Sequence, residues 1–192
     1  IKVVDPRQGE IMFGLNLIVN RGKKIFLCDT SVIEYPDAKQ LAEMAKSAAR
    51  VVRLFGFDPK IAFLSHSTFG EPATDRTKRL SDAVEILKKD NVDFKFDGEM
   101  QPDVALEEVY KELYPFSEIV GSSNVLIMPS QHSAAISYKM IKSMSRAKVI
   151  GPLLVGLGQP IEIAPLRSST SDIINLASIA AYSADVIQYK KN

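Results

Sequence analysis

The chain has 192 residues, of which 46% are hydrophobic, a composition typical of a globular domain rather than a disordered segment. Its 24 basic and 23 acidic residues leave a net charge of +1, which argues against general attraction to nucleic acid or to a membrane surface. No apolar run approaches the roughly 20 residues of a membrane span. A single cysteine, Cys28, excludes an internal disulfide and fits a reducing compartment, so we expect a cytoplasmic protein.

The first third of the chain predicts strands followed by a long helix. Residues 1–7 suggest a short strand, and residues 11–19 are apolar with little periodicity, which fits either a strand or a buried helix. A turn follows at 20–22, and residues 25–29 predict a strand. Pro36 then opens a helix over residues 37–55. Its apolar residues recur at spacings of three and four and form one stripe (Leu41, Met44, Ala45, Ala48, Val52 and Phe55).

The middle of the chain alternates strands and helices. We predict strands at 61–64, 94–96 and 124–128, and helices at 75–89, 104–113 and 133–144. This alternation is typical of an α/β protein with a parallel sheet flanked by helices. Right-handed crossovers place the carboxyl ends of the strands on one edge. The polar loops after these strands therefore converge there, and we expect a ligand site on that edge (loops 29–30, 65–70, 97–101 and 129–130).

The sequence changes in character after residue 150. Residues 151–160 are rich in Gly and Pro, which suits a hinge or a crossing between two lobes. A strand at 161–165 and a helix from 168–170 to about 188 follow. One strand and one helix are too little for a lobe, and the chain starts at Ile1 rather than Met. We therefore expect a piece of a longer polypeptide, with residues 1–150 as one lobe and 151–192 as a return into another.

Two polar stretches offer candidate ligand contacts. Ser65, Ser67 and Gly70 follow a buried strand and could expose hydroxyl and backbone N–H groups to an anion, although an ordinary strand-to-helix loop fits as well. Glu99 and Gln101 lie in the stretch 97–103, whose alternative interpretation is a solvated turn that caps the next helix. Neither stretch matches a known metal-binding spacing, and we expect no metal site.

Several segments together resemble the phosphate acetyl/butyryl transferase family, and within it the transferase-like C-terminal domain of large bacterial malic enzymes. The segments shared with the family run in order through most of the chain (64–70, 97–101 with Asp103, 123–129, 136–139, 150–156 and 172–175). Those shared with the malic-enzyme variant are 26–30, 49–56, 97–101 and 114–117. The resemblance implies a two-lobed phosphotransacetylase fold, similar to isocitrate and isopropylmalate dehydrogenases, with the first lobe incomplete.

The resemblance also exposes a departure. Related transacetylases carry a Ser-Arg pair shortly before the final helix, where the Arg holds the anionic group, and an Asp in the first turn of that helix that acts as a base on the CoA thiol. Here Pro165 and Leu166 stand at the positions of the pair, while Asp172 remains and Arg167 is one residue away. From the residues alone, Asp172 also fits simple complementation of the helix dipole.

The first hypothesis is a regulatory and oligomerising domain of a malic enzyme that binds acetyl-CoA without turning it over. The parent would decarboxylate malate to pyruvate with NAD(P) and Mg²⁺ or Mn²⁺, all bound by its own N-terminal malic domain, and this chain would hold no cofactor and no catalytic residue. The second hypothesis is an active acyltransferase that interconverts acetyl-CoA and acetyl phosphate, with Asp172 as base and Arg167 in place of the expected Arg. The third is a purely structural dimerisation module, which exposed apolar residues on the 37–55 helix would favour.

Overall fold

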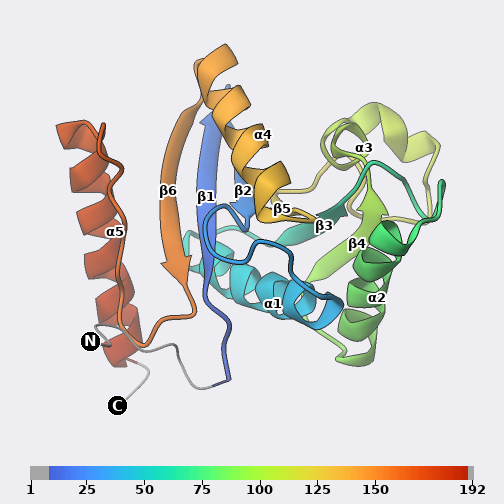
Figure 1. Cartoon of the computed structure of the whole chain (residues 1–192), viewed down its shortest axis with the longest axis horizontal. Helices are drawn as coiled ribbons and strands as arrows, with labels where there is room; N and C mark the ends of the chain where they lie inside the picture. The colour runs from blue at the N-terminus through green and yellow to red at the C-terminus, as the bar shows by residue number, and fades with distance from the viewer. Residues whose placement is uncertain (1–8, 190–192) are drawn as a thin grey trace.

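The computed structural model describes residues 9–189, with side chains through residue 184. Within this range one six-stranded sheet has the order β4-β3-β5-β2-β1-β6 (Figure 1). The strands are β1 Phe13–Asn20, β2 Lys23–Cys28, β3 Lys60–Leu64, β4 Lys95–Met100, β5 Val125–Ile127 and β6 Lys148–Val155. The helices are α1 Ala38–Leu54, α2 Asp75–Lys89, α3 Pro102–Leu106, η1 Glu108–Glu112, α4 Gln131–Met144 and α5 Thr170–Tyr189.

The sheet is mixed, not parallel throughout as the alternation predicted. Strands β2, β3, β4 and β5 pair in parallel, whereas β1 is antiparallel to both of its neighbours, β2 and β6. The cause is the turn between β1 and β2. Arg21 and Gly22 both have positive φ, at 49° and 82°, and two such residues form a tight hairpin loop. The α/β class is confirmed, with one strand reversed.

The helices cover both faces of the sheet. Helices α1 and α2 pack on one face around a core that includes Phe26 and Phe63, and α3 and α4 lie on the other face, near Leu27 and Leu126. The predicted stripe of α1 is buried, with Leu41 and Met44 fully inaccessible. Each such side chain contributes about 1.5–3 kcal/mol when it leaves water, so this face fixes α1 on the sheet.

Three predicted elements differ from the structure. The helix expected over 104–113 is two short pieces, α3 and η1, because the chain turns at Glu107, where φ and ψ are extended. Residues 161–165 form no strand and make a single bridge between Glu162 and Leu153. Residues 97–100 belong to β4 rather than to a loop after it, so the side chain of Glu99 points into the protein. The short strand expected at 1–7 lies outside the described residues.

The first half of the segment 151–160, which was expected to form a hinge, belongs to a strand. β6 runs through Gly151 and Pro152, pairs with β1 and belongs to the same sheet as the rest of the chain. A change of lobe at residue 150 stays a prediction. After β6 the chain turns back along the sheet edge, and α5 lies beside β6, at the opposite end of the sheet from β4 (Figure 1). No helix among the described residues is long and apolar enough to span a membrane.

Candidate functional site

The loops that follow β2, β3 and β5 surround a cavity of about 430 Å³ at the carboxyl edge of the sheet. β3 and β5 are neighbours here, and the helices that follow them, α2 and α4, lie on opposite faces. A crevice opens between two strands whose connections leave in opposite directions, and ligands of α/β proteins usually bind there. We name this cavity the switch-point pocket. The carboxyl edge of the strands, where the sequence predicts a ligand site, thus contains a cavity.

The switch-point pocket combines cationic, hydroxyl and apolar groups. Its lining includes His66, Arg76 and Arg79 together with Ser65, Ser130, Leu64 and Met128. Arg79 is held in place, since its Nη1 donates to the carbonyl of Pro36 at 2.6 Å and its Nη2 to that of Pro129 at 2.7 Å. Its guanidinium also stacks 3.6 Å from the Tyr35 ring centroid. Burial lowers the pKa of this guanidinium, and its Nε has no hydrogen-bond partner among the described residues.

The predicted anion cradle is occupied by a carboxylate of the protein itself. Ser67 Oγ donates to Glu99 Oε1 at 3.0 Å, the Gly70 N–H donates to the same oxygen at 2.7 Å, and Ser81 Oγ donates to Oε2 at 2.5 Å. Glu99 is 1% exposed. Burial raises the pKa of this carboxyl, but the hydrogen bonds from Ser81, Gly70 and Ser67 outweigh that effect and leave the pKa below its ordinary value. The cradle therefore ties the 65–71 loop to β4 and α2.

Other loop residues on this edge also have internal partners. Ser65 lines the switch-point pocket, and its Oγ lies 3.2 Å from Ser67 Oγ, within hydrogen-bond distance. The Gln101 N–H donates to Thr68 Oγ1 at 3.2 Å, and Gln101 begins α3. Asp29, at the end of β2, accepts from the backbone N–H groups of Gly14 at 2.7 Å and Ile33 at 2.6 Å. Of the candidate ligand contacts predicted for this edge, Ser65 lines the cavity, beside His66 and Ser130 of the predicted loops.

Arg167 and Asp172 lie elsewhere. They line a cavity of about 80 Å³ beside the start of β6 and α5, together with Lys142 and Pro165. Strands β5, β2 and β1 separate β6 from β3 in the sheet, so the structure does not bring these two residues together with Ser65 and Gly70. Asp172 Oδ2 accepts from Ser169 Oγ at 2.7 Å and from the Ser169 N–H at 3.0 Å, and these bonds lower the pKa of the carboxyl. The Asp172 N–H donates in turn to Ser169 Oγ at 3.2 Å, and this reciprocal pairing is typical of a helix start.

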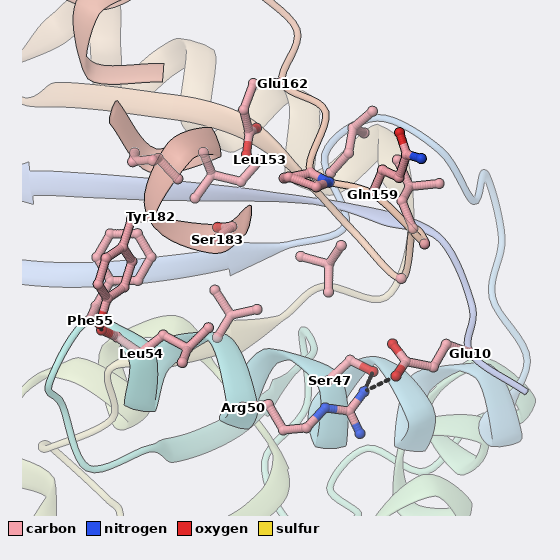
Figure 2. Close-up of a pocket in the computed structure, with 18 of the residues that line it drawn as sticks. Glu10, Ser47, Arg50, Leu54, Phe55, Leu153, Gln159, Glu162, Tyr182 and Ser183 are labelled. Carbon is pink, nitrogen blue, oxygen red and sulfur yellow. Dashed lines mark hydrogen bonds and ion pairs between the residues drawn. The ribbon is translucent and has the colours of Figure 1, made fainter. Parts of the chain in front are cut away.

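A third cavity, of about 620 Å³, lies between α1, β6, the 156–160 loop and α5 (Figure 2). Its walls are largely apolar. On the α1 side, Arg50 Nη2 pairs with Glu10 Oε1 at 3.1 Å and with Ser47 Oγ at 2.9 Å. Among the described residues, no group of three or more His, Cys, Asp or Glu side chains could hold a metal ion.

The comparison with known families is decisive. A model of the phosphate acetyl/butaryl transferase family matches residues 1–181. The chain belongs to this family. The expected resemblance is confirmed, and the fold agrees: a Streptococcus pyogenes phosphotransacetylase superposes with a TM-score of 0.89 at 31% identity, covering 96% of this chain and 57% of that one.

Within the family, the chain is similar to parts of two kinds of enzyme. It is 43% identical over 183 residues to an NADP-dependent malic enzyme of Rhizobium meliloti, covering 95% of this chain and 24% of that protein. It is 32% identical over 186 residues to a phosphate acetyltransferase of Bacillus subtilis, covering 96% of this chain and 58% of that protein. The chain thus spans about a quarter of the malic enzyme, consistent with the transferase-like C-terminal domain expected from the sequence.

Three residues of the switch-point pocket were missed by sequence reasoning. Arg76 and Arg79 belong to the first turns of α2, where basic residues read as ordinary surface charge, and Tyr35 lies in the loop before α1. The available signal was the spacing of the two arginines. Residues three apart on a helix share a face, so this spacing predicts that the two side chains point in the same direction.

Proposed function

We propose that this chain is the transferase-like C-terminal domain of a malic enzyme, and that it binds acetyl-CoA and regulates the parent enzyme without acyl transfer of its own. The observation that carries the proposal is the replacement of the family's Ser-Arg pair by Pro165 and Leu166. Leu166 is fully exposed, and a leucine offers no group that could hold a phosphate. The high identity to malic enzymes supports the same assignment.

The ligand we assign to the switch-point pocket is the CoA ester. Arg76, Arg79 and His66 supply positive charge for the phosphates of CoA, and Leu64 and Met128 supply an apolar wall for its thioester arm. Ser65 would form a hydrogen bond with the ligand. Ser67, Gly70 and Glu99 would act indirectly, because their mutual hydrogen bonds fix the loop that carries Ser65. Gln101 would help to hold the same loop, because its backbone N–H donates a hydrogen bond to Thr68.

In the longer protein, the N-terminal malic domain would hold NAD(P) and the divalent metal and would oxidise malate. Acetyl-CoA would shift its activity by binding two states of the protein unequally, which is the thermodynamic requirement for allostery. A cytoplasmic location fits the cofactor pools that such a reaction uses.

The test is a titration of the malic enzyme that contains this chain with acetyl-CoA, following malate-dependent NAD(P) reduction and acetyl phosphate formation together. We expect reduction to change and no acetyl phosphate to appear. Arg76→Glu should weaken the response about tenfold, equivalent to about 1.4 kcal/mol of binding free energy. Lys78→Glu, on the same helix but paired with Asp82, is the matched control. An unchanged rate of reduction at saturating acetyl-CoA contradicts the proposal.

One observation favours the alternative of acyl transfer. Arg167 and Asp172 line the same small cavity, so Arg167 stands near the position where the family carries its anion-binding Arg. Appearance of acetyl phosphate in the titration, and its loss in Arg167→Ala, would establish this function in place of the regulatory one.

We also propose that the chain forms homo-oligomers through α4. Ile136, Met140 and Met144 recur every four residues on α4 and are 58%, 53% and 81% exposed. Within α4, all of whose residues are described, Ala134 alone is buried. A stripe of this kind is typical of a helix that packs on a partner. α1, by contrast, places its stripe in the core, so the dimerising surface considered on that helix is not where the exposed apolar residues lie.

A further inference from the structure

The cavity between α1, β6 and α5 has no part in the function proposed above and is physically separate from the switch-point pocket. Its volume of about 620 Å³ falls in the range of small-molecule sites, about 300–1,000 Å³. Its apolar wall comes from three elements: Val51 and Leu54 on α1 with Phe55 at the end of that helix, Leu153 on β6, and Ile179 on α5. We name it the α1–α5 pocket.

A single carboxyl group interrupts this apolar wall. Glu162 follows β6, and in Figure 2 its carboxyl is directed into the pocket beside Leu153. The backbone N–H of Leu154 donates to this carboxyl, whereas Glu162 Oε2 is buried and has no hydrogen-bond partner among the described residues. A buried carboxylate oxygen without a donor is costly, and such groups usually mark a missing partner.

No basic side chain in the described lining of the pocket pairs with the Glu162 carboxyl. Arg50 is the basic residue of the lining, and its guanidinium is engaged by Glu10 and Ser47. Figure 2 places this ion pair at the opposite side of the pocket from Glu162. The Tyr182 hydroxyl donates to the Leu54 carbonyl at 3.4 Å. Neither group donates to Glu162, and Oε2 is open to a donor from a bound ligand.

We propose that the α1–α5 pocket binds a small amphipathic amine, whose ammonium group pairs with Glu162 and whose hydrocarbon body lies against Leu153, Leu54 and Ile179. The ammonium group supplies the hydrogen bonds that Oε2 lacks and neutralises a buried negative charge. The hydrocarbon body removes the apolar wall from water. A carboxylate ligand is disfavoured by repulsion from Glu162. This inference does not depend on the proposed function.

The experiment uses three probes with the same hydrocarbon body, hexylamine, 1-hexanol and hexanoate, titrated into the 192-residue chain at pH 8 and followed by NMR chemical shifts. We expect hexylamine to bind about tenfold more tightly than 1-hexanol, and hexanoate to bind most weakly. Shifts should concentrate on α1, β6 and α5. Glu162→Gln should reduce the affinity for hexylamine to that for 1-hexanol and leave the latter unchanged.

Two further variants keep the result interpretable. Ile179→Phe places a larger side chain in the pocket and should weaken the binding of hexylamine and 1-hexanol alike. Glu85→Gln, on an exposed face of α2, removes a carboxylate far from the pocket and should change neither. The proposal is overturned if hexanoate binds as tightly as hexylamine, if Glu162→Gln leaves the affinity for hexylamine unchanged, or if no probe shifts the pocket residues. It is equally overturned if dilution alone shifts them, because a second copy of the chain would then fill the pocket.

Discussion

Ser81 on α2 donates a 2.5 Å hydrogen bond to Glu99 on β4, and through it the carboxylate links a helix, a strand and the 65–71 loop. The buried carboxylate of Glu99 therefore has a structural role. Because Ser67 and Gly70 donate to the other oxygen, this one side chain helps to fix the position of the loop.

Replacing Glu99 by Gln should destabilise the chain by about 1.5–3 kcal/mol, since an amide NH₂ cannot accept the bonds that a carboxylate oxygen accepts. Thermal unfolding at pH 7 measures this, with Glu85→Gln on the exposed face of α2 as control. Equal melting temperatures of Glu99→Gln and the wild type would contradict the role of the link.

The same pair predicts an acid dependence. The pKa of Glu99 is lowered in the fold, so its stabilising effect is complete above the ordinary pKa of a carboxyl and is lost as pH falls through the lowered value. The difference in melting temperature between wild type and Glu99→Gln should therefore shrink as the pH is brought from 6 toward 3. A difference that stays constant over this interval would show that the charge of Glu99 has no part in it.

Glu162 predicts the opposite trend. Burial raises its pKa to about 7, so the folded chain holds this proton more tightly than the unfolded chain does. Stability then falls as pH rises from the ordinary carboxyl value to about 7, and the loss is complete above it. Glu162→Gln should raise the free energy of unfolding at pH 8 by about 1 kcal/mol, after allowance for solvent screening, or about 2–4 °C in melting temperature. The exposed Glu112→Gln is the control, and a variant no more stable than wild type at pH 8 would refute the assignment.

Arg79→Lys should loosen the two loops that flank the switch-point pocket. Lysine keeps the charge but cannot reach the carbonyls of Pro36 and Pro129 at once or stack on Tyr35. We expect a loss of about 1–3 kcal/mol in stability and faster amide hydrogen exchange in residues 31–37 and 129–133. Arg76→Lys changes an exposed arginine of the same pocket that does not bridge the two loops, and it should leave the exchange rates unchanged. Unaltered exchange in Arg79→Lys would mean that the loops do not need this bridge.

Met140→Glu should convert an oligomer of this chain into a monomer, because a carboxylate at the centre of the α4 stripe would be buried without a partner. Sedimentation velocity measures the change. Leu113→Glu is the matched control, since Leu113 is also an exposed apolar residue, at 67%, but lies at the end of η1. A monomeric wild type, or an oligomer that survives Met140→Glu, would remove α4 from the interface.

The elements that sequence reasoning located best are those with clear boundaries. α2 begins after Thr74, whose side chain caps it, and α1 after Asp37, and both helices carry an apolar stripe. β1 was ambiguous because its first six residues are all buried, which removes the alternation that identifies a strand. β6 was missed because Gly151 and Pro152, which usually end strands, lie in its middle.

The candidate site was only partly predictable, for a physical reason. The edge of the sheet follows from the order of strands and helices, so Ser65 could be placed there. What each side chain does there depends on partners far away in the chain, as with Gly70 and Glu99, or Arg79 and Pro129. Local sequence patterns do not reveal which distant residues form such pairs. For the same reason, the sequence does not show that Asp172, beside β6, lies apart from Ser65 at the end of β3.

β6 has a consequence for how the chain reaches its native state. It pairs with β1, which lies near the other end of the chain, and this pairing covers an apolar strand edge that would otherwise be open. Contacts between segments so distant form late in folding, because the intervening chain must first be ordered. Until β6 docks, β1 is an uncovered edge able to pair with another molecule. Aggregation during refolding should therefore depend on how quickly β6 pairs with β1. A short peptide with the sequence of β6 should suppress this aggregation.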